Sequence, residues 1–95
     1  MNRVKQAALC RFYLNLIEFI ENLGHGENDF TGLMSCALSF SEQTRRDMRT
    51  AAELVFYERN FRYYKKQPPR PQFVTRRDHF IQTIEGKVLS LQGER

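Results

Sequence analysis

The sequence contains few of the side chains that catalysis and metal binding require. Its 95 residues include only two histidines and two cysteines. The separations among Cys10, Cys36, His25 and His79 match none of the usual zinc-ligand pairs, and Gly24-His25-Gly26 lacks the spacing and the lysine of a phosphate-binding loop. No Ser, Asp or Cys stands at a suggestive local spacing for nucleophilic catalysis, although triads also assemble from distant segments. We interpret His25 as an exposed loop residue rather than a mobile general base, and we expect a non-enzymatic protein without a metal or cofactor.

Long hydrophobic runs are also missing. The longest apolar stretches fall far short of the roughly 20 residues that a membrane span needs. The N-terminus lacks the cationic start, apolar stretch and small-residue cleavage site of a secretory signal. Without signs of secretion, Cys10 and Cys36 are better explained as buried reduced thiols than as a disulfide. We expect a cytoplasmic protein.

The chain is short, but it has enough apolar side chains to fold. Of its residues, 41% are hydrophobic and eight are Phe, while Trp is absent. This length suits one small domain, and a core of this size makes folding with a partner or self-association a realistic alternative. There is no internal repeat and no β-type alternation. We predict an all-α fold, a small bundle of two long helices plus a third helix with a Pro-rich turn, in which residues 1–95 form a single helical domain.

The first long helix is predicted between Asn2 and Leu23. Asn2 suits the N-cap, and Gly24 is a strong stop signal. Only a narrow stripe of this helix is polar, at Arg11, Asn15, Glu18 and Asn22. A helix that is apolar around most of its circumference has to be covered on two sides. Either the other helices surround it, or it also forms an interface.

The second long helix is predicted to run to about Lys66. Ser39 with Glu42 forms a capping box at its start, and Ser41 is the competing cap. One or two helical turns are possible before it, over residues 32–38.

A Pro-rich basic connector is predicted over residues 67–74, because the residue before Pro68 is pushed out of helical geometry. Thr75 and Asp78 make a second capping box, and a third helix follows to about Leu91. The apolar stripes of the three helices predict a buried core that includes Phe12, Leu16, Ile20, Leu54, Phe61, Ile81, Ile84 and Val88.

Charge is segregated along the chain. Between Arg59 and Arg77 there are seven Lys or Arg residues and no Asp or Glu, although the net charge of the whole chain is only +4. The stretch from Phe12 to Thr44 has the opposite bias, with five acidic residues and no Lys or Arg. Such a distribution steers an anionic partner toward one part of the surface.

Helical spacing within the basic run puts Arg59, Arg62 and Lys66 on one face, while Glu58 and Arg62 should pair weakly on the outside. The interleaved aromatic side chains could stack on nucleic-acid bases while the cations bind phosphate. The same surface suits an acidic protein, since Arg and Tyr are enriched in interface hot spots. A solvated basic face over the core is the third alternative. We favour a functional surface, with the partner-binding residues Arg59, Arg62, Tyr63, Lys65, Lys66, Arg70, Arg76 and Arg77.

The small size, the helical pattern and the segment Tyr63-Tyr64-Lys65-Lys66-Gln67-Pro68-Pro69-Arg70-Pro71 resemble the small anti-RecBCD, recombination-modulating proteins of lambdoid bacteriophages of the Salmonella type. The resemblance implies a protein that binds the host RecBCD helicase–nuclease, chiefly through its RecC subunit, in the host-cell cytoplasm. It would alter the nuclease so that phage recombination can proceed. The resemblance also implies association with a host peptidyl-prolyl cis-trans isomerase, with Pro68 as the isomerase contact. The alternative functions are a small basic DNA- or RNA-binding regulator and an adaptor that self-assembles through its first helix.

The bond between Gln67 and Pro68 has two possible roles. It can be a rigid trans connector, or it can interconvert slowly between cis and trans as exposed X-Pro bonds do. Its isomeric state would set where Arg70 points relative to Arg59. Our hypothesis is that the partner-bound form selects the cis isomer and that a host prolyl isomerase assists this choice.

Overall fold

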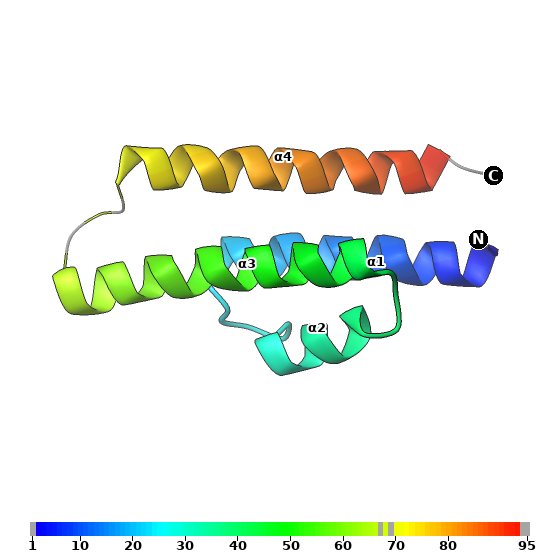
Figure 1. Ribbon diagram of the computed structural model, residues 1–95, viewed down its shortest axis with the longest axis horizontal. Coiled ribbons are helices and arrows are strands. Elements are labelled where there is room, and N and C mark those ends of the chain that lie inside the picture. The colour runs from blue at the N-terminus through cyan, green and yellow to red at the C-terminus, as the bar shows by residue number, and fades with distance from the viewer. Residues whose placement is uncertain (1, 67, 69, 94–95) are drawn as a thin grey trace.

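The computed structural model describes residues 2–66, 68 and 70–93, with the side chains of all of these except Tyr64 and Lys65. These residues form helices and no strand, as the sequence predicted (Figure 1). In chain order the elements are α1 (Arg3–Glu21), α2 (Phe30–Ala37), α3 (Glu42–Asn60), the π-helix η1 (Phe61–Lys65) and α4 (Pro71–Gly93). The all-α class is therefore confirmed. Its detail differs, because the described residues contain three long helices and a short one.

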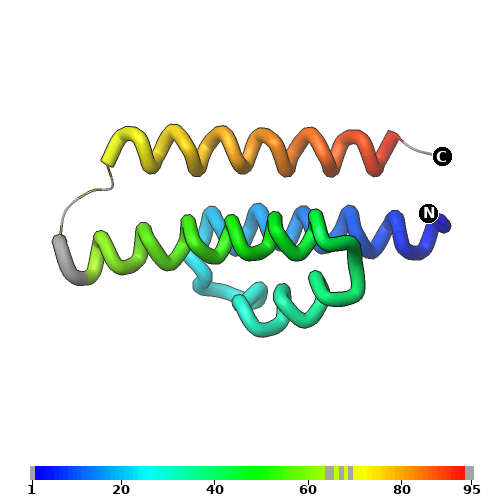
Figure 2. The backbone as a smooth tube through the Cα atoms, in the orientation of Figure 1, coloured from blue at the N-terminus to red at the C-terminus, as the bar shows by residue number. Residues whose placement is uncertain are grey.

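Helix α1 is the central element of the bundle. It packs against α2, α3 and α4, so the other helices surround it. Figures 1 and 2 show α4 along one side of α1 and α3, and α2 on the opposite side. The start of α1 and the end of α4 lie together at one end of the molecule, whereas the end of α3 and the start of α4 lie at the other. The longest dimension is 46 Å.

The buried core draws side chains from all four α-helices. Its fully enclosed members include Leu16, Met48 and Ile84, each with no exposed surface. The prediction of burial is confirmed for Phe12, Leu16, Ile20, Leu54, Ile84 and Val88. It is wrong for Phe61 and Ile81, which are only partly buried. Phe61 lies at the tip of the bundle, where its ring stacks on Tyr57 at 6.1 Å, and Tyr57 is itself 45% exposed.

The helix starts are fixed by side-chain caps. The Asn2 side chain accepts a hydrogen bond from the backbone N–H of Lys5 at 2.8 Å, as predicted. Ser41, the competing cap, starts α3 in place of Ser39. The short helix begins two residues earlier than predicted, because Asp29 accepts a hydrogen bond from the N–H of Gly32 at 2.8 Å and caps α2.

Helix α1 ends in a left-handed turn. Leu23 and Gly24 have φ values of 54° and 79°, and the N–H of Gly24 donates to the carbonyl of Phe19 at 2.8 Å. A Cβ at position 24 would lie 3.3 Å from Val55 Cγ1 and 3.4 Å from Arg59 Nη1. Glycine is needed here both for the positive φ and for the close approach of α3.

The last helix starts earlier than the sequence predicted. Helix α4 begins at Pro71, not at Thr75, so the predicted connector over residues 67–74 is shortened from its C-terminal side. The N–H groups of Phe73 and Val74 already donate to the carbonyl of Arg70, at 3.0 and 3.1 Å. Proline is favoured in the first turn because its missing N–H would have no helical acceptor. The hypothesis about the Gln67–Pro68 bond lies outside the described residues.

The two cysteines are separate free thiols. Cys10 is partly buried, but Cys36 is exposed, so the prediction of a buried thiol is wrong at position 36. Cys36 lies on the outer side of α2, whose buried side chains are Leu33 and Ala37. No helix in the described part of the chain is both long and apolar enough to cross a membrane.

Candidate functional site

The basic run covers one end of the bundle, formed by the last turns of α3, by η1 and by the start of α4. Its cations do not form one continuous face there. The fold places Arg59, Arg62, Arg70 and Arg76 along two surface grooves and joins Arg62 and Arg77 to an internal ion cluster, while Lys66 is exposed and lines neither groove.

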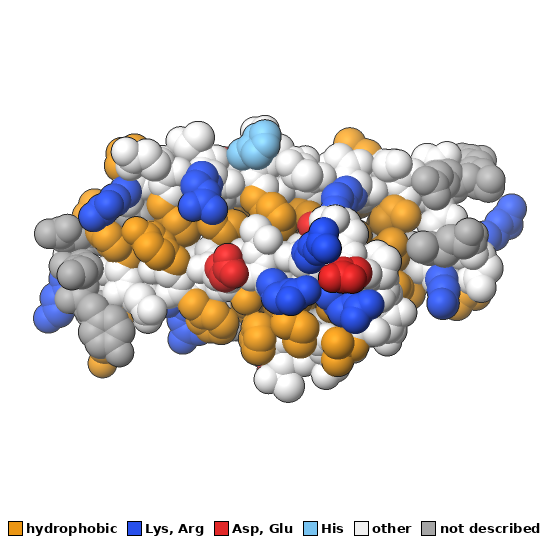
Figure 3. Space-filling view, viewed as in Figure 1, with side chains coloured by type: hydrophobic (Ala, Val, Ile, Leu, Met, Phe, Trp, Pro, Cys, Tyr) orange, Lys and Arg blue, Asp and Glu red, His pale blue; other side chains and the backbone are white. Residues whose placement is uncertain are grey.

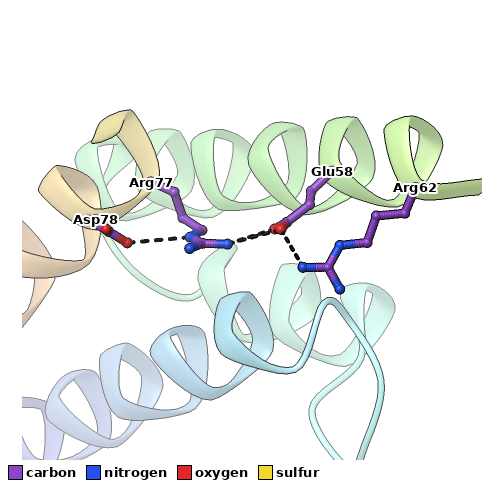
Figure 4. A network of polar contacts seen from close by, with 4 residues as sticks. All are labelled: Glu58, Arg62, Arg77 and Asp78. Atoms are coloured by element: carbon purple, nitrogen blue, oxygen red, sulfur yellow. Dashed lines mark hydrogen bonds and ion pairs between the residues drawn. The ribbon is translucent and has the colours of Figure 1, made fainter. Parts of the chain in front are cut away.

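The internal cluster is centred on Glu58 (Figure 4). This carboxylate has a side-chain exposure of 1%. Arg62 Nη2 donates to it at 2.9 Å, and Arg77 Nη1 lies 3.0 Å from both carboxylate oxygens. The predicted pairing of Glu58 with Arg62 is therefore present, but it is not the exterior pair expected, because α4 covers the carboxylate. Arg77 is an internal partner of Glu58 and not the free partner-binding residue that the sequence suggested.

The first groove, here called the aromatic groove, lies beside the last turn of α3 and has a volume of about 840 Å³. Arg59 and Arg62 supply its cations, and Phe56 and Tyr63 are 40% and 74% exposed. The Phe56 ring also packs against Phe30 of α2, with centroids 5.7 Å apart. The residues that line the groove include no Asp or Glu: Leu23, His25, Phe56, Arg59, Asn60, Arg62 and Tyr63.

The second groove, the interhelical groove, lies between α3 and α4 and has a volume of about 410 Å³. Tyr57 and Phe73 form its aromatic part, with ring centroids 4.8 Å apart. Arg70 and Arg76 contribute positive charge, but Glu53 lies among the same lining residues. Figure 3 shows hydrophobic side chains gathered between α3 and α4 toward this end of the molecule, with Lys and Arg side chains beside them.

The predicted partner-binding residues thus lie in different parts of the structure. Arg59, Arg62 and Tyr63 line the aromatic groove, and Arg70 and Arg76 line the interhelical groove. Of the predicted shared face, Arg59 and Arg62 lie in one groove, but Lys66 is not among the residues that line it. The chain changes to a π-helix at Phe61, and Lys66 has a left-handed backbone with φ 54°, so α-helical spacing no longer holds. The side chain of Lys65 lies outside the described residues, and Pro68 is exposed.

A second internal cluster joins α4 to α1 and α3. The Asp47 carboxylate accepts hydrogen bonds from the Tyr13 hydroxyl and from Lys87 Nζ, both at 2.7 Å. Burial raises the pKa of Tyr13 to about 12, opposed by a hydrogen bond with Thr44 and supported by the hydrogen bond and negative charge of Asp47. This cluster could not be predicted from the sequence, because its partners are far apart in the chain and nothing in their local spacing marks them.

The described grooves present charge and aromatic surface rather than reactive groups. No group of three His, Cys, Asp or Glu side chains that could hold a metal ion occurs in the part of the chain that the structure describes. The two grooves can bind an anionic segment. Their Arg side chains can donate hydrogen bonds to its negative groups, and their aromatic rings can contact its apolar parts.

Comparison with known proteins identified no relative. No protein-family model, no curated protein and no solved structure matches this chain.

Proposed function

We propose that this chain is a non-enzymatic phage protein that binds the host RecBCD helicase–nuclease through its RecC subunit and alters it in favour of phage recombination. The choice of RecBCD rests on the resemblance of the segment from Tyr63 to Pro71. The choice of a binding protein rests on the basic end of the bundle.

One observation carries the binding proposal. Arg59, Lys66, Arg70 and Arg76 have no acidic partner among the described residues, whereas Arg62 and Arg77 share Glu58. Arg59 lies in the groove with Phe56 and Tyr63, and Arg70 and Arg76 lie in the groove with Tyr57. Both grooves offer positive charge and aromatic surface that an acidic protein face would complement. Complementary charge of this kind speeds association and excludes wrong partners.

The test is binding of purified RecBCD to the full chain and to a variant with Arg59, Lys66, Arg70 and Arg76 all changed to Glu. Arg62 is left intact because reversing its charge would also disturb buried Glu58. The variant should lose RecBCD binding while keeping its helical circular dichroism. Arg49→Glu is the control for Arg59, since Arg49 is an exposed residue of the same helix, α3, and has no ion pair in the described part. This control should bind normally.

Two results would contradict the proposal. One is RecBCD binding by the quadruple variant at wild-type strength. The other is tight binding of naked DNA by the wild-type chain, falling steeply with salt by roughly one log-slope unit per phosphate contact. The second result would favour the DNA- or RNA-binding alternative.

The proposal extends to a host prolyl isomerase with Pro68 as its contact. Pro68 is exposed between η1 and α4, where an enzyme could reach it. Pro68→Ala should abolish association with the isomerase, measured by co-purification from bacterial lysate. Unchanged association in this variant would exclude Pro68 as the contact.

A further inference from the structure

The aromatic groove adjoins a surface of opposite charge. A second hollow of about 420 Å³, here called the acidic hollow, is lined by Glu18, Glu21, Asn22, His25, Glu27 and Asn28. It includes three carboxylates and no Lys or Arg. His25 lines both the acidic hollow and the aromatic groove. The two sites therefore meet at His25, and the sign of the surface charge changes across it.

This boundary is built by the left-handed turn after α1. The turn at Leu23 and Gly24 reverses the chain, so that His25 stands between the carboxylates of α1 and the arginines of α3. The missing side chain of Gly24 lets the Arg59 guanidinium lie against the turn, at 3.4 Å from where a Cβ would be. The positive and negative sites are thus fixed to the same short piece of backbone.

Two side chains of the aromatic groove are held in place by contacts with their neighbours. Arg62 Nη2 is bound to buried Glu58, while its side chain remains 55% exposed, so other N–H groups of its guanidinium can face a ligand. Phe56 is supported by its contact with Phe30. An arginine and an aromatic ring that are already held in place lose little conformational entropy when they bind an acidic and aromatic segment.

We propose that the aromatic groove and the acidic hollow together bind one segment of a protein partner, in which acidic and aromatic residues are followed or preceded by Lys or Arg. The acidic and aromatic part would occupy the aromatic groove, and the basic part would lie against Glu18, Glu21 and Glu27. This inference rests on the proposed function in that it assumes a protein partner, and it specifies the recognised segment.

The neighbouring carboxylates favour a protein segment over a nucleic acid. A single strand carries negative charge at every nucleotide, so a strand that leaves the groove across His25 would meet three like charges in the acidic hollow. A polypeptide can change sign along its length and match both sites. The interhelical groove is the weaker candidate for the same segment, because Glu53 opposes an anion there.

The experiment uses fluorescence anisotropy with three labelled probes and the full-length chain. The first probe is a peptide with Glu and Phe in one half and Lys in the other. The second has the same composition with its charges alternating, and the third is an oligothymidylate. The segregated peptide should bind roughly tenfold more tightly than the alternating one, which corresponds to about 1.4 kcal/mol.

Variants then separate the two sites. Arg59→Gln and Glu21→Lys should each weaken binding of the segregated peptide. The matched controls Arg49→Gln and Glu85→Lys should not, because both residues are exposed and neither lines the aromatic groove, the interhelical groove or the acidic hollow. Glu21→Lys should also strengthen oligothymidylate binding, because it removes a repulsive charge next to the groove. A merely destabilised protein would lose affinity for every probe, so the opposite response of the two probes keeps the result interpretable even if the variant is less stable.

Equal affinity for the two peptides, tighter binding of oligothymidylate than of the segregated peptide, or an unchanged response in Glu21→Lys would each overturn the inference. The same variants assayed against RecBCD distinguish this failure from failure of the proposed function. If the wild-type chain binds RecBCD and Glu21→Lys binds equally well, the segment inference is wrong while the proposed function stands. If the wild-type chain does not bind RecBCD but binds the segregated peptide more tightly than the alternating one, the proposed partner is wrong and the segment inference stands.

Discussion

Replacing Glu58 by Gln should be one of the most damaging conservative changes in the molecule. The substitution keeps the size of the side chain and removes its charge. Arg77, with 25% of its side chain exposed, would then lie beside a neutral amide and keep only the half-exposed carboxylate of Asp78, which is 3.4 Å from its Nε (Figure 4). Arg62 can turn toward water, since it is 55% exposed, and its own pair with Glu58 should contribute less than about 1 kcal/mol.

The expected loss follows from the burial of Glu58 and Arg77. Removing one partner of a buried ion pair costs about 3–5 kcal/mol. The Gln oxygen can still accept a hydrogen bond, so we expect about 2–4 kcal/mol. A chain of this length has a free energy of unfolding of about 5–14 kcal/mol. The variant should therefore lose a large share of its stability, and its urea midpoint should fall by roughly 2 M at a slope near 1–1.5 kcal/mol/M.

Urea denaturation followed by far-ultraviolet circular dichroism measures this loss. Glu53→Gln is the matched control, because Glu53 is an exposed carboxylate of α3 without an ion pair among the described residues. It should change the unfolding free energy by less than about 0.5 kcal/mol. Changing both Glu58 and Arg77 to Met should restore much of the stability, since neither charge is then left alone. Equal midpoints for Glu58→Gln and Glu53→Gln would refute the assigned role of this cluster.

Two further predictions concern the core. Tyr13 has its pKa raised to about 12 from about 10 in the unfolded chain, so the folded state retains the proton more strongly and stability is lost as the pH rises from about 10 to about 12. The loss of stability amounts to about 2–3 kcal/mol. The urea midpoint of Tyr13→Phe should therefore decline less steeply with pH over this range than that of the wild type. Parallel plots of midpoint against pH for the two proteins would contradict the assignment. Leu16→Ala should lower the free energy of unfolding by about 2–5 kcal/mol, because Leu16 is completely buried. Leu89 is 69% exposed, so Leu89→Ala should lower it by well under 1 kcal/mol in the same urea assay. Similar losses at both positions would mean that the apolar stripes are misassigned.

The sequence predicted those parts of the fold that depend on local chemistry. The cap at Asn2 and the stop at Gly24 bound α1 as expected, because capping involves groups within one turn. The start of α4 was misplaced, since both Thr75 and Pro71 are acceptable starts and only the packing of Phe73 into the bundle distinguishes them. The π-helix at Phe61 was also beyond prediction, because no local pattern marks the change in helical hydrogen bonding.

The candidate site was predictable in composition but not in arrangement. The sequence showed that positive charge is concentrated between Arg59 and Arg77, yet the apparent lack of acidic compensation in this run was misleading. Glu58 stands one residue before the run and neutralises two of its members, and the contribution of Arg77 arises only when α4 folds back. The acidic hollow was likewise visible as a charge bias in the sequence, but its contact with the basic end through His25 depends on the turn after α1.

The two buried ion clusters fix the register of α4. Its apolar residues Phe80, Ile84 and Val88 recur at every fourth position, so a slide of one helical turn, about 5.4 Å, would place apolar side chains on apolar side chains again. The same slide would take Lys87 from Asp47 and Arg77 from Glu58 at once. Asp47 would then keep only neutral donors such as the Tyr13 hydroxyl, and Glu58 would keep only the half-exposed Arg62. Losing both α4 cations would cost several kcal/mol, a large share of the stability of a domain of this size. Apolar packing holds α4 against the bundle, and the charged pairs determine its position along the helix axis.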